Sequence, residues 1–505
     1  MSHVTQAPRF HGRLANSGLN PNVLWPIAVM AGFAVWAQSR WGVCSDTSWL
    51  LTVGEQTLAG KTPYVDILEV NPPASILLYL PAVAAARLFG ATPEFMADLL
   101  CLAAIAASLA LAGAIVIRGA LLGGEAVPWL AAYAGAALFV LPAHAFDQRD
   151  HVALIVALPC LASLAVRAAG GRVEPLLAVA AGLGAGVAMS IKPHFALLFA
   201  PNVLYLAQRG GWRTAFVAIE PYVALTVFAL YGAAAVLFFP AFFQSAAPLL
   251  RDIYLPSRLD FASLVIDPLF FAWIGALALV AITAGRRLET PLVAVPTLAS
   301  LGAMGAFLIQ GKDFPYQSYP ALALAVLALG ASALEWRERP RGPIVLGCAI
   351  AIIMAPAYLA LARSDAHLRL EEVVGSVAAH PKVIAIAGGG IGVGHPLTRR
   401  VHGVWAGRLC SLWITDLSSR ALLRDGLDEA AKARYRQYLS FDRQTLVADI
   451  VANKPDVVLI AGEQWKAWAF SHPDVAAALA DYAPQGEADG VTVYARAKPR
   501  PQAST

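Results

Sequence analysis

Three carboxylates near the start of the chain are the first residues whose types and spacing could do chemistry. Asp46, Asp66 and Glu69 lie in one stretch between two apolar segments. Carboxylates grouped in one loop could supply a general base or bind a cation, and their spacing does not decide between these roles. Residues 47–59 are predicted to form an amphipathic helix that lies in the membrane interface. Asp46 occupies the expected N-cap of this helix, where a capping side chain contributes about 1 kcal/mol. Capping and catalysis are compatible.

A second group of ionisable residues lies between two later apolar segments, in the sequence HAFDQRDH from His144 to His151. Ionisable groups at membrane depth are costly and are functional candidates by default. Asp147, Arg149, Asp150 and His151 are therefore predicted to contribute to a site. The alternative is a plain interface loop in which Arg149 pairs with Asp147 or Asp150.

Two isolated lysines form the third feature. Between Lys61 and Lys382 the chain uses arginine as its cation except at Lys192 and Lys312. Lys192 lies in the segment SIKPH, where Pro193 ends a helix and His194 follows, and Lys312 lies in QGKDFPYQSYP. Lysine is a compact point-charge donor suited to phosphate. The alternative is that each lysine only extends its ammonium to the lipid headgroups.

The composition defines the kind of protein that must position these residues. The chain has 505 residues, of which 58% are hydrophobic and 14% charged, against roughly 25% charged in soluble domains. The mean hydropathy is +0.61. These values exclude an ordinary soluble enzyme, a disordered chain and a nucleic-acid-binding protein. The net charge of +4 predicts no polyanionic partner, and the five scattered cysteines form no CxxC or zinc spacing.

Apolar segments long enough for membrane helices, which need about 20 residues, organise the first 362 residues. Residues 74–89 are ambiguous, and we interpret them as a helix along the membrane. After residue 363 the charge rises and apolar runs shorten to strand length. The eleven predicted spans are residues 22–38, 95–117, 127–143, 151–166, 175–191, 193–207, 215–239, 263–284, 291–309, 320–335 and 343–362.

Arginines in the short loops predict the orientation, because basic loops favour the cytoplasm. With eleven spans, the arginine clusters fall on one side, and the acids, histidines and isolated lysines fall on the other. We therefore predict a cytoplasmic tail over residues 1–21 and a transmembrane domain over residues 22–362. That domain includes a long first external loop, residues 39–94. Residues 363–505 are predicted to form an external soluble domain.

Two further segments have predicted structure. In the last domain, residues 382–387, 456–460 and 491–496 are expected to be strands, and residues 421–438 and 443–453 helices. This pattern predicts a small α/β unit. Residues 388–394 are rich in glycine, but His395 and Pro396 follow them, so no helix N-terminus is available to hold a nucleotide phosphate.

Residues 240–262 could form a lid over a lipid substrate or only an interfacial helix.

In their order along the chain, these motifs resemble those of the GT-C superfamily of integral-membrane glycosyltransferases. The similar groups are the protein O-mannosyltransferases, the lipid A aminoarabinose transferases and the catalytic subunit of oligosaccharyltransferase. The resemblance covers roughly residues 20–335. It depends on Asp46 after the first helix, G-K-x-P-Y at 60–64, an acidic N-P-P segment at 69–73, the acids of 147–151, S-x-K-P-H at 190–194 and K-x-x-P-Y-x-x-Y-P at 312–320.

The resemblance implies a reaction and roles for these residues. The donor would be a polyprenyl-phosphate sugar, with Asp46 as the general base on an acceptor hydroxyl. Transfer would invert the anomeric centre, and Lys192, Lys312 and Arg149 would stabilise the phosphate leaving group. Some relatives bind a divalent cation and others need none. Here the residues expected to contact substrate or such a cation are Asp66, Glu69, Asp147, Asp150, His151 and His194.

The sequence thus predicts a polytopic α-helical, GT-C-like membrane protein with about eleven transmembrane helices and a small C-terminal α/β domain. The expected location is a bacterial inner membrane, with the C-terminal domain periplasmic. The acceptor could be a glycan, a lipid or a protein, and no nucleic acid is expected as a partner. The alternative function is transport of a lipid-linked envelope precursor. A transporter would place its ionisable groups mid-membrane and often has repeated halves, neither of which the sequence shows.

Overall fold

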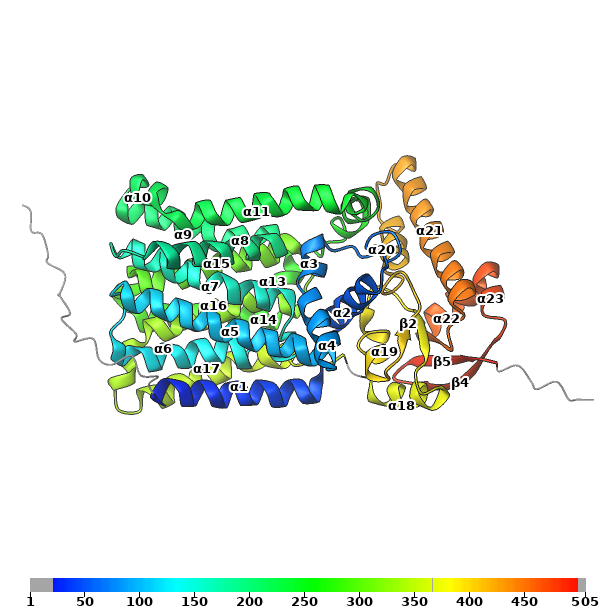
Figure 1. The fold of residues 1–505 in the computed structure, drawn as a ribbon, viewed down its shortest axis with the longest axis horizontal. Coiled ribbons are helices and arrows are strands. Elements are labelled where there is room, and N and C mark those ends of the chain that lie inside the picture. Colours follow the sequence, from blue (N-terminus) through cyan, green and yellow to red (C-terminus); the bar gives the residue numbers. More distant parts are fainter. Residues whose placement is uncertain (1–20, 366, 498–505) are drawn as a thin grey trace, which may run out of the picture.

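A helical bundle and a smaller α/β unit lie side by side along the long axis of the molecule (Figure 1). The structure is a computed structural model and describes residues 21–365 and 367–497. Most of the expected N-terminal tail, residues 1–20, lies outside the described residues. The fold is that of a polytopic α-helical membrane protein with a small C-terminal sheet, as the sequence predicts.

Every apolar segment predicted to span the membrane is helical in the structure. Among the described residues, 6 helices are long and apolar enough to cross a membrane, namely Pro93–Arg118, Arg149–Ala168, Ile219–Phe238, Pro268–Glu289, Pro291–Gln310 and Gly342–Leu361. The bundle contains α1 (Pro21–Trp41), α5 (Pro93–Arg118), α6 (Val127–Gly135), α7 (Arg149–Ala168), α8 (Pro175–Ile191), α9 (Ala196–Gly210), α11 (Ile219–Phe238), α14 (Pro268–Ala284), α15 (Pro291–Gln310), α16 (Pro315–Ser332) and α17 (Gly342–Leu361).

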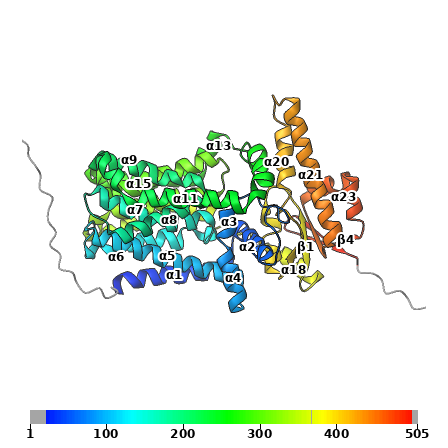
Figure 2. The same cartoon turned by 45° about the horizontal axis from the view of Figure 1, so that its top comes forward.

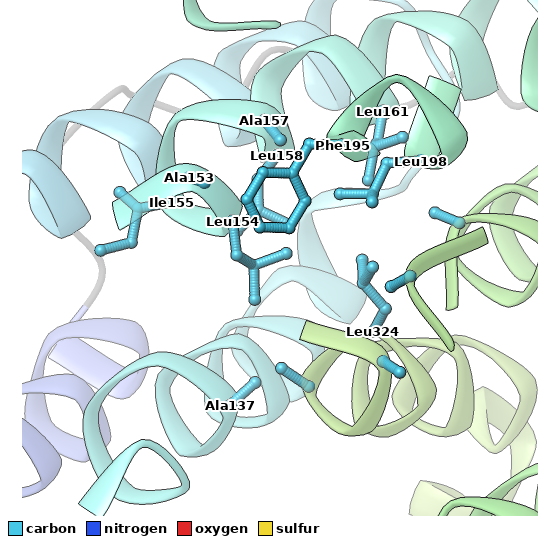
Figure 3. Packing of buried hydrophobic residues seen from close by; sticks show 14 of the residues in the cluster. Ala137, Ala153, Leu154, Ile155, Ala157, Leu158, Leu161, Phe195, Leu198 and Leu324 are labelled. Atoms are coloured by element: carbon cyan, nitrogen blue, oxygen red, sulfur yellow. The ribbon is translucent and has the colours of Figure 1, made fainter. Parts of the chain in front are cut away.

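The α7 helix forms the centre of the bundle. In α7, 78% of its most apolar window is buried, against 11% in α11. Phe195 and Leu198 point at the leucines of α7, and Leu324 of α16 lies beneath them (Figure 3). Close helix contacts depend on glycine, because a Cβ on Gly302 would lie 1.9 Å from the Leu197 carbonyl oxygen. Small residues allow the same close approach in membrane proteins generally.

The arginine-rich loops gather at the end of the bundle that lies away from the α/β unit. The short α10 helix (Trp212–Val217) marks this end in Figure 1. Ion pairs connect neighbouring loops there: Arg118 pairs with Glu174, Arg287 with Glu335 and Arg337 with Glu125. We call this the arginine end. The other end of the bundle, which adjoins the α/β unit, carries Asp46, the 144–151 loop and Lys192.

Short helices lie between the bundle and the α/β unit. They are α2 (Ser45–Leu58), α3 (Pro73–Leu77), α4 (Leu80–Phe89), α13 (Phe261–Val265) and a helix over residues 240–254, which has a π-helical turn at each end. Segment 74–89 is thus two helices, and α4 runs across the axis of the bundle (Figure 2). The sequence predicted a span beginning at residue 263, but α14 begins at Pro268, because Asp267 accepts a hydrogen bond from the Leu269 amide (2.6 Å) and caps the helix.

The α/β unit contains a five-stranded sheet in the order β2-β1-β3-β5-β4. The three predicted strands are confirmed as β1 (Lys382–Ile386), β3 (Val457–Ala461) and β5 (Val491–Arg496), while β2 (Val404–Trp405) and β4 (Tyr482–Ala488) were not predicted. The β2-β1-β3 pairs are parallel, and β5 pairs antiparallel with β3 and β4. The helices are α18 (Leu368–Val377), α19 (Leu397–Arg400), α20 (Trp413–Leu422), α21 (Glu429–Asn453), α22 (Gly462–Ser471) and α23 (Pro473–Ala478).

The predicted helix boundaries in this unit were wrong. Instead of helices over 421–438 and 443–453, α20 ends at Leu422 and α21 runs unbroken from Glu429 to Asn453. Gly426 adopts a φ of 80° between them, a conformation that glycine adopts readily. Asp428 then caps α21 by accepting a hydrogen bond from the Ala431 amide (2.6 Å).

The α/β unit packs on α2 and its neighbours. Trp49 and Val53 of α2 share an apolar cluster with Leu370, Val383 and Val493. Residues 47–54 of α2 are all buried. The sequence predicted an amphipathic helix in the membrane interface, but here α2 is enclosed on most of its faces because the C-terminal unit covers the side that the bundle leaves open.

Candidate functional site

Asp46 lies at the start of α2, where its carboxylate is free from capping. Cys44 occupies the N-cap position and makes no capping hydrogen bond through its side chain. The backbone amide of Ser45 instead donates to Asp365 Oδ2 (2.9 Å), and Asp365 also contacts the His144 ring at 3.5 Å. The N-cap assignment of Asp46 was therefore wrong, because Asp365, 320 positions after Ser45, supplies the acceptor.

Two residues from the 144–151 loop point their donors at Asp46. Arg149 Nη2 and Gln148 Nε2 each lie 3.4 Å from Asp46 Oδ2. Gln148 is the N-cap of α7, and its Oε1 accepts a hydrogen bond from the Asp150 amide (2.6 Å). Capping therefore orients the Gln148 amide nitrogen toward α2. The Asp46 side chain keeps 23% exposure, so a ligand can reach it.

The Arg149 guanidinium is buried and only partly used. Arg149 is 4% exposed, and its Nη1 donates to Ser75 Oγ at 3.1 Å. Its Nε has no hydrogen-bond partner among the described residues. The proposed interface loop, with Arg149 paired to Asp147 or Asp150, is not what the structure shows, because the Arg149 ion pair is with Asp46.

Lys192 supplies the second cation of the site. Pro193 follows it, α8 ends at Ile191, and Lys192 takes an extended backbone conformation. Its Nζ donates to Asp150 Oδ2 at 2.6 Å and to Gln310 Oε1 at 3.3 Å, and it lies 5.5 Å from the centre of the Tyr316 ring. Burial lowers the pKa of Lys192, and Asp150 opposes this shift. Because an ammonium has three donors, one N–H remains for a ligand.

These four side chains form one group, which we call the charge cluster: Asp46, Arg149, Asp150 and Lys192. Two carboxylates and two cations from α2, the 144–151 loop and the end of α8 meet at the end of the bundle covered by the C-terminal unit. Asp150 Oδ1 has no partner among the described residues. The cluster is thus balanced in charge but keeps free donors on both cations.

Glu69 lies beside this cluster and is held by its own loop. Trp49 Nε1 donates to Glu69 Oε2, and Asn71 donates to Glu69 Oε1 from its backbone amide (2.6 Å) and its side chain (2.5 Å). Burial raises the pKa of Glu69, while the charge of Arg149 acts in the opposite direction. Glu69 therefore shapes the first loop and is electrostatically connected to Arg149.

Asp147 and His151 hold the second loop in place. Thr47 of α2 donates to Asp147 Oδ1 (3.0 Å), and Tyr79 donates to the Asp147 carbonyl (3.0 Å). His151 Nδ1 accepts from the Asp147 amide at 3.2 Å, closing a turn in which Asp147 has a φ of 62°. Burial raises the pKa of Asp147. These contacts bind the loop to α2, so they position Gln148 and Arg149.

The remaining predicted site residues lie outside the charge cluster. Lys312 donates from Nζ to the Tyr254 carbonyl and to Ser257 O and Oγ (2.8 and 2.6 Å), so all three of its donors are used. Asp66 is exposed and accepts from the Thr62 amide (2.8 Å). His194 is half-buried beside Lys192. The roles predicted for these three residues stay predictions.

The donor set does not form a cation site in this arrangement. Across residues 21–365 and 367–497, no three His, Cys, Asp or Glu side chains are placed to hold a metal ion. Glu69 is bonded to Trp49 and Asn71, and Asp150 to Lys192. Dependence on a divalent cation stays a prediction.

Several contacts of the charge cluster were not anticipated. Three of the contacting residues lie inside motifs identified from the sequence, namely Gln148, Gln310 and Tyr316. Their closeness along the chain to the predicted charged residues was the signal that could have found them. Ser75 follows the N-P-P segment, and its only signal is that position. Asp365 carries no signal, because it lies in the connection to the C-terminal unit.

Comparison with known proteins gives a match in fold. No protein-family model matches the sequence, and no curated protein matches it. The solved structure of ArnT from Cupriavidus metallidurans in the apo state matches with a TM-score of 0.56 and 13% identity, over 95% of this chain and 99% of that one. The same protein bound to undecaprenyl phosphate matches with a TM-score of 0.50, 17% identity and the same coverage. ArnT is the lipid A aminoarabinose transferase, a GT-C enzyme. The chain therefore has the ArnT-like GT-C fold that its motifs predicted.

Proposed function

We propose that this protein is a glycosyltransferase that moves a sugar from a polyprenyl-phosphate donor to an acceptor hydroxyl. The observation that carries the proposal is the convergence of Asp46, Arg149 and Lys192 at one end of the bundle. The Asp46 carboxylate can take the proton of an acceptor hydroxyl there. Arg149 and Lys192 keep N–H donors that can bind a phosphate. The match to ArnT, which is solved with undecaprenyl phosphate bound, supports a donor of that class.

Asp46 is proposed as the general base. Its carboxylate accepts the proton of the acceptor O–H while the acceptor oxygen forms a bond to the anomeric carbon. The bond from that carbon to the phosphate oxygen breaks, and its electron pair leaves on polyprenyl phosphate. Attack opposite to the leaving group inverts the anomeric centre. A positioned base of this kind contributes roughly 10²–10⁴ in rate.

Arg149 and Lys192 are proposed to bind the donor phosphate. Arg149 Nε is unpartnered among the described residues, and Lys192 has one N–H unassigned. Donors held in place before the reaction stabilise charge that develops on the leaving group, because they need no reorganisation. A phosphate that draws Arg149 toward itself would also weaken the 3.4 Å contact with Asp46 and so leave Asp46 a stronger base.

The proposed location is the outer face of a bacterial inner membrane. The arginine end then faces the cytoplasm, since basic loops favour that side, and the charge cluster and the C-terminal unit face the periplasm. The donor would enter from the outer leaflet. The acceptor is proposed to be an envelope glycan, lipid or protein.

The test is a release assay with the purified full-length protein. Polyprenyl-phosphate sugars are supplied as a panel together with an envelope extract as acceptor, and released polyprenyl phosphate is measured. We expect release from at least one donor, reduced roughly 10²–10⁴-fold in Asp46→Asn. Absence of release from every donor, together with transbilayer movement of a labelled polyprenyl-phosphate sugar in proteoliposomes, would support the transporter instead. A parallel reaction with EDTA tests the predicted dependence on a divalent cation.

A further inference from the structure

A pocket outside the charge cluster lies where three distant parts of the chain meet. Its volume is about 200 Å³. The first loop contributes Tyr64 and Glu69, and the 240–254 helix contributes Gln244 and Ser245. The remaining wall comes from Tyr438 and Phe441 of α21, in the C-terminal unit.

We propose that this pocket binds a neutral sugar ring of the acceptor. The inference rests on the proposed function and deepens it, because it names the chemical class that the site recognises in its second substrate. It also gives the C-terminal unit a part in the site, since α21 supplies a wall.

The polar groups of the pocket have unused hydrogen-bonding capacity. Glu69 accepts three hydrogen bonds, from Trp49 and Asn71, whereas a carboxylate offers about four acceptor positions. The Tyr438 hydroxyl donates to Asp252 Oδ2 (2.9 Å), which leaves its lone pairs free to accept. Gln244 is exposed at the rim of the pocket, where its amide can donate and accept. Such a set suits hydroxyl groups, which both donate and accept.

The rest of the lining is apolar and aromatic. Leu68, Pro248 and Leu249 line the pocket together with Phe441, which is 39% exposed. Pockets of this kind bind the apolar surface of a ligand, while a few polar groups fix its orientation. A sugar ring has an apolar C–H face and a hydroxyl edge, so it matches both parts of this lining.

Charge argues for a neutral ring. Among the residues that the structure describes, the lining contains a carboxylate and no lysine or arginine, so a phosphate or carboxylate ligand would be repelled and left unpaired. The cations of the site, Arg149 and Lys192, are instead in the charge cluster. The donor phosphate and the acceptor ring would thus be sorted by charge between the two neighbouring sites.

Existing contacts hold the three walls together. Ser245 donates to the Tyr64 carbonyl (2.8 Å), joining the 240–254 helix to the first loop. Tyr438 and Asp252 join the same helix to α21. Glu69 connects the pocket to the charge cluster, because it lines the pocket and the Arg149 charge acts on its carboxylate. The pocket is therefore built from supported side chains, and it adjoins the proposed base through Glu69 and Arg149.

The experiment measures glycoside binding to the full-length protein by saturation-transfer NMR. The probes are methyl β-glucoside, methyl β-galactoside and methyl N-acetyl-β-glucosaminide, with glucose 1-phosphate as the anionic comparison. Phe441→Ala removes one wall, and Gln244→Trp fills the mouth from an exposed position. Phe470→Ala is the matched control, since Phe470 is an exposed phenylalanine of the same unit (48%) outside the pocket lining.

We expect at least one methyl glycoside to bind, with a dissociation constant raised tenfold or more by Phe441→Ala and by Gln244→Trp and changed less than twofold by Phe470→Ala. Undecaprenyl phosphate binding should stay within twofold in all three variants. The proposal is overturned if no glycoside binds, if both pocket variants bind like the unaltered protein, or if glucose 1-phosphate competes best.

The two proposals can fail separately. If glycosides bind in the pocket but no donor releases polyprenyl phosphate, the glycosyltransferase proposal fails, and the pocket remains a sugar site. If donors react but glycoside binding does not respond to either pocket variant, the glycosyltransferase remains, and the acceptor ring binds elsewhere.

Discussion

Each end of the bundle contains a buried ion pair, and the two pairs differ in how completely their atoms are used. At the arginine end, Arg167 Nε donates to both oxygens of Glu220 (2.9 and 3.0 Å), and Ser163 donates to the same carboxylate. At the other end, Lys192 pairs with Asp150 at 2.6 Å, and Asp150 Oδ1 has no partner among the described residues. The Glu220 carboxylate is thus fully engaged, whereas the Asp150 carboxylate keeps one oxygen available to a ligand.

This difference teaches which buried charges are candidates for chemistry. Leaving a buried polar group unsatisfied costs about 1–3 kcal/mol, so an unpartnered atom needs an explanation such as a ligand. Arg149 Nε and His194 Nε2, near Lys192, also have no partner within the described part of the chain. Exposed pairs such as Arg118–Glu174, with side chains 59% and 55% exposed, contribute about 0–1 kcal/mol and serve mainly as surface contacts.

The largest effect is expected from Asp46→Asn. Loss of the base should reduce sugar transfer by roughly 10²–10⁴-fold, while the isosteric amide leaves the fold and donor binding intact. The measurement is release of polyprenyl phosphate, with undecaprenyl phosphate binding as the second readout. Asp260→Asn is the control, because Asp260 caps α13 and asparagine caps equally well. Turnover by Asp46→Asn at the unaltered rate would remove Asp46 from the mechanism.

Breaking the two buried pairs should separate their roles. Lys192→Met is expected to weaken undecaprenyl phosphate binding by roughly 10–100-fold, because a charge-assisted donor to phosphate is lost. Arg167→Met should leave that binding unchanged and lower the unfolding free energy by about 3–5 kcal/mol, because Glu220 becomes an unpaired buried charge. Ligand binding and thermal unfolding are measured on both variants. If Lys192→Met bound undecaprenyl phosphate as tightly as the unaltered protein, the two buried ion pairs would not differ in ligand binding.

A smaller effect is expected from Lys312→Met. In the structure Lys312 binds the backbone of residues 254–257, so its loss should loosen that segment and weaken undecaprenyl phosphate binding only a few-fold. The phosphate role predicted from the sequence would make the loss as large as for Lys192→Met. Titrating both variants with undecaprenyl phosphate in one experiment decides between these roles.

The smallest effect concerns pH at the junction of the two units. His395 is buried between Trp49 and Trp405, with ring centroids 5.2 and 4.5 Å away, and burial lowers its pKa to about 3. Between pH 6.5 and 3 the unfolded chain takes up a proton that the folded chain does not, so the unfolding free energy falls as the pH falls. His395→Phe should remove this loss.

The measurement is thermal unfolding at pH 7.5 and pH 5. We expect the drop in melting temperature to be a few degrees smaller in His395→Phe than in the unaltered protein. His380→Phe, at an exposed histidine of the same unit, should behave like the unaltered protein. An identical drop in His395→Phe would mean that His395 does not couple the junction to pH.

Much of the fold could be predicted because helices and strands leave local patterns. The apolar segments are helical, and strands β1, β3 and β5 were predicted from short runs of apolar residues. Helix ends were less predictable where a cap or a glycine decides them, as at Asp267 and Gly426. The placement of α2 was also wrong, because its environment depends on the C-terminal unit that covers it.

The candidate site was predictable by residue type and less so by partner. Scarcity of charge made Asp46, Arg149, Asp150 and Lys192 visible, and these are the four that the structure brings together. Asp66 and Lys312 had the same kind of signal, but the structure uses them in local contacts. Spacing along the chain does not show whether a donor is already satisfied.

By itself, the sequence determined that this is a polytopic membrane protein with sparse charge, and it assigned Asp46, the 144–151 group and the isolated lysines to the side opposite the arginine-rich loops. Hydropathy and charge are local properties, so they can be read without a fold. Only the tertiary structure decided that Asp365 caps α2 and so leaves Asp46 free to face Arg149. Such pairings join residues more than a hundred positions apart, and packing of the helices alone brings them within bonding distance.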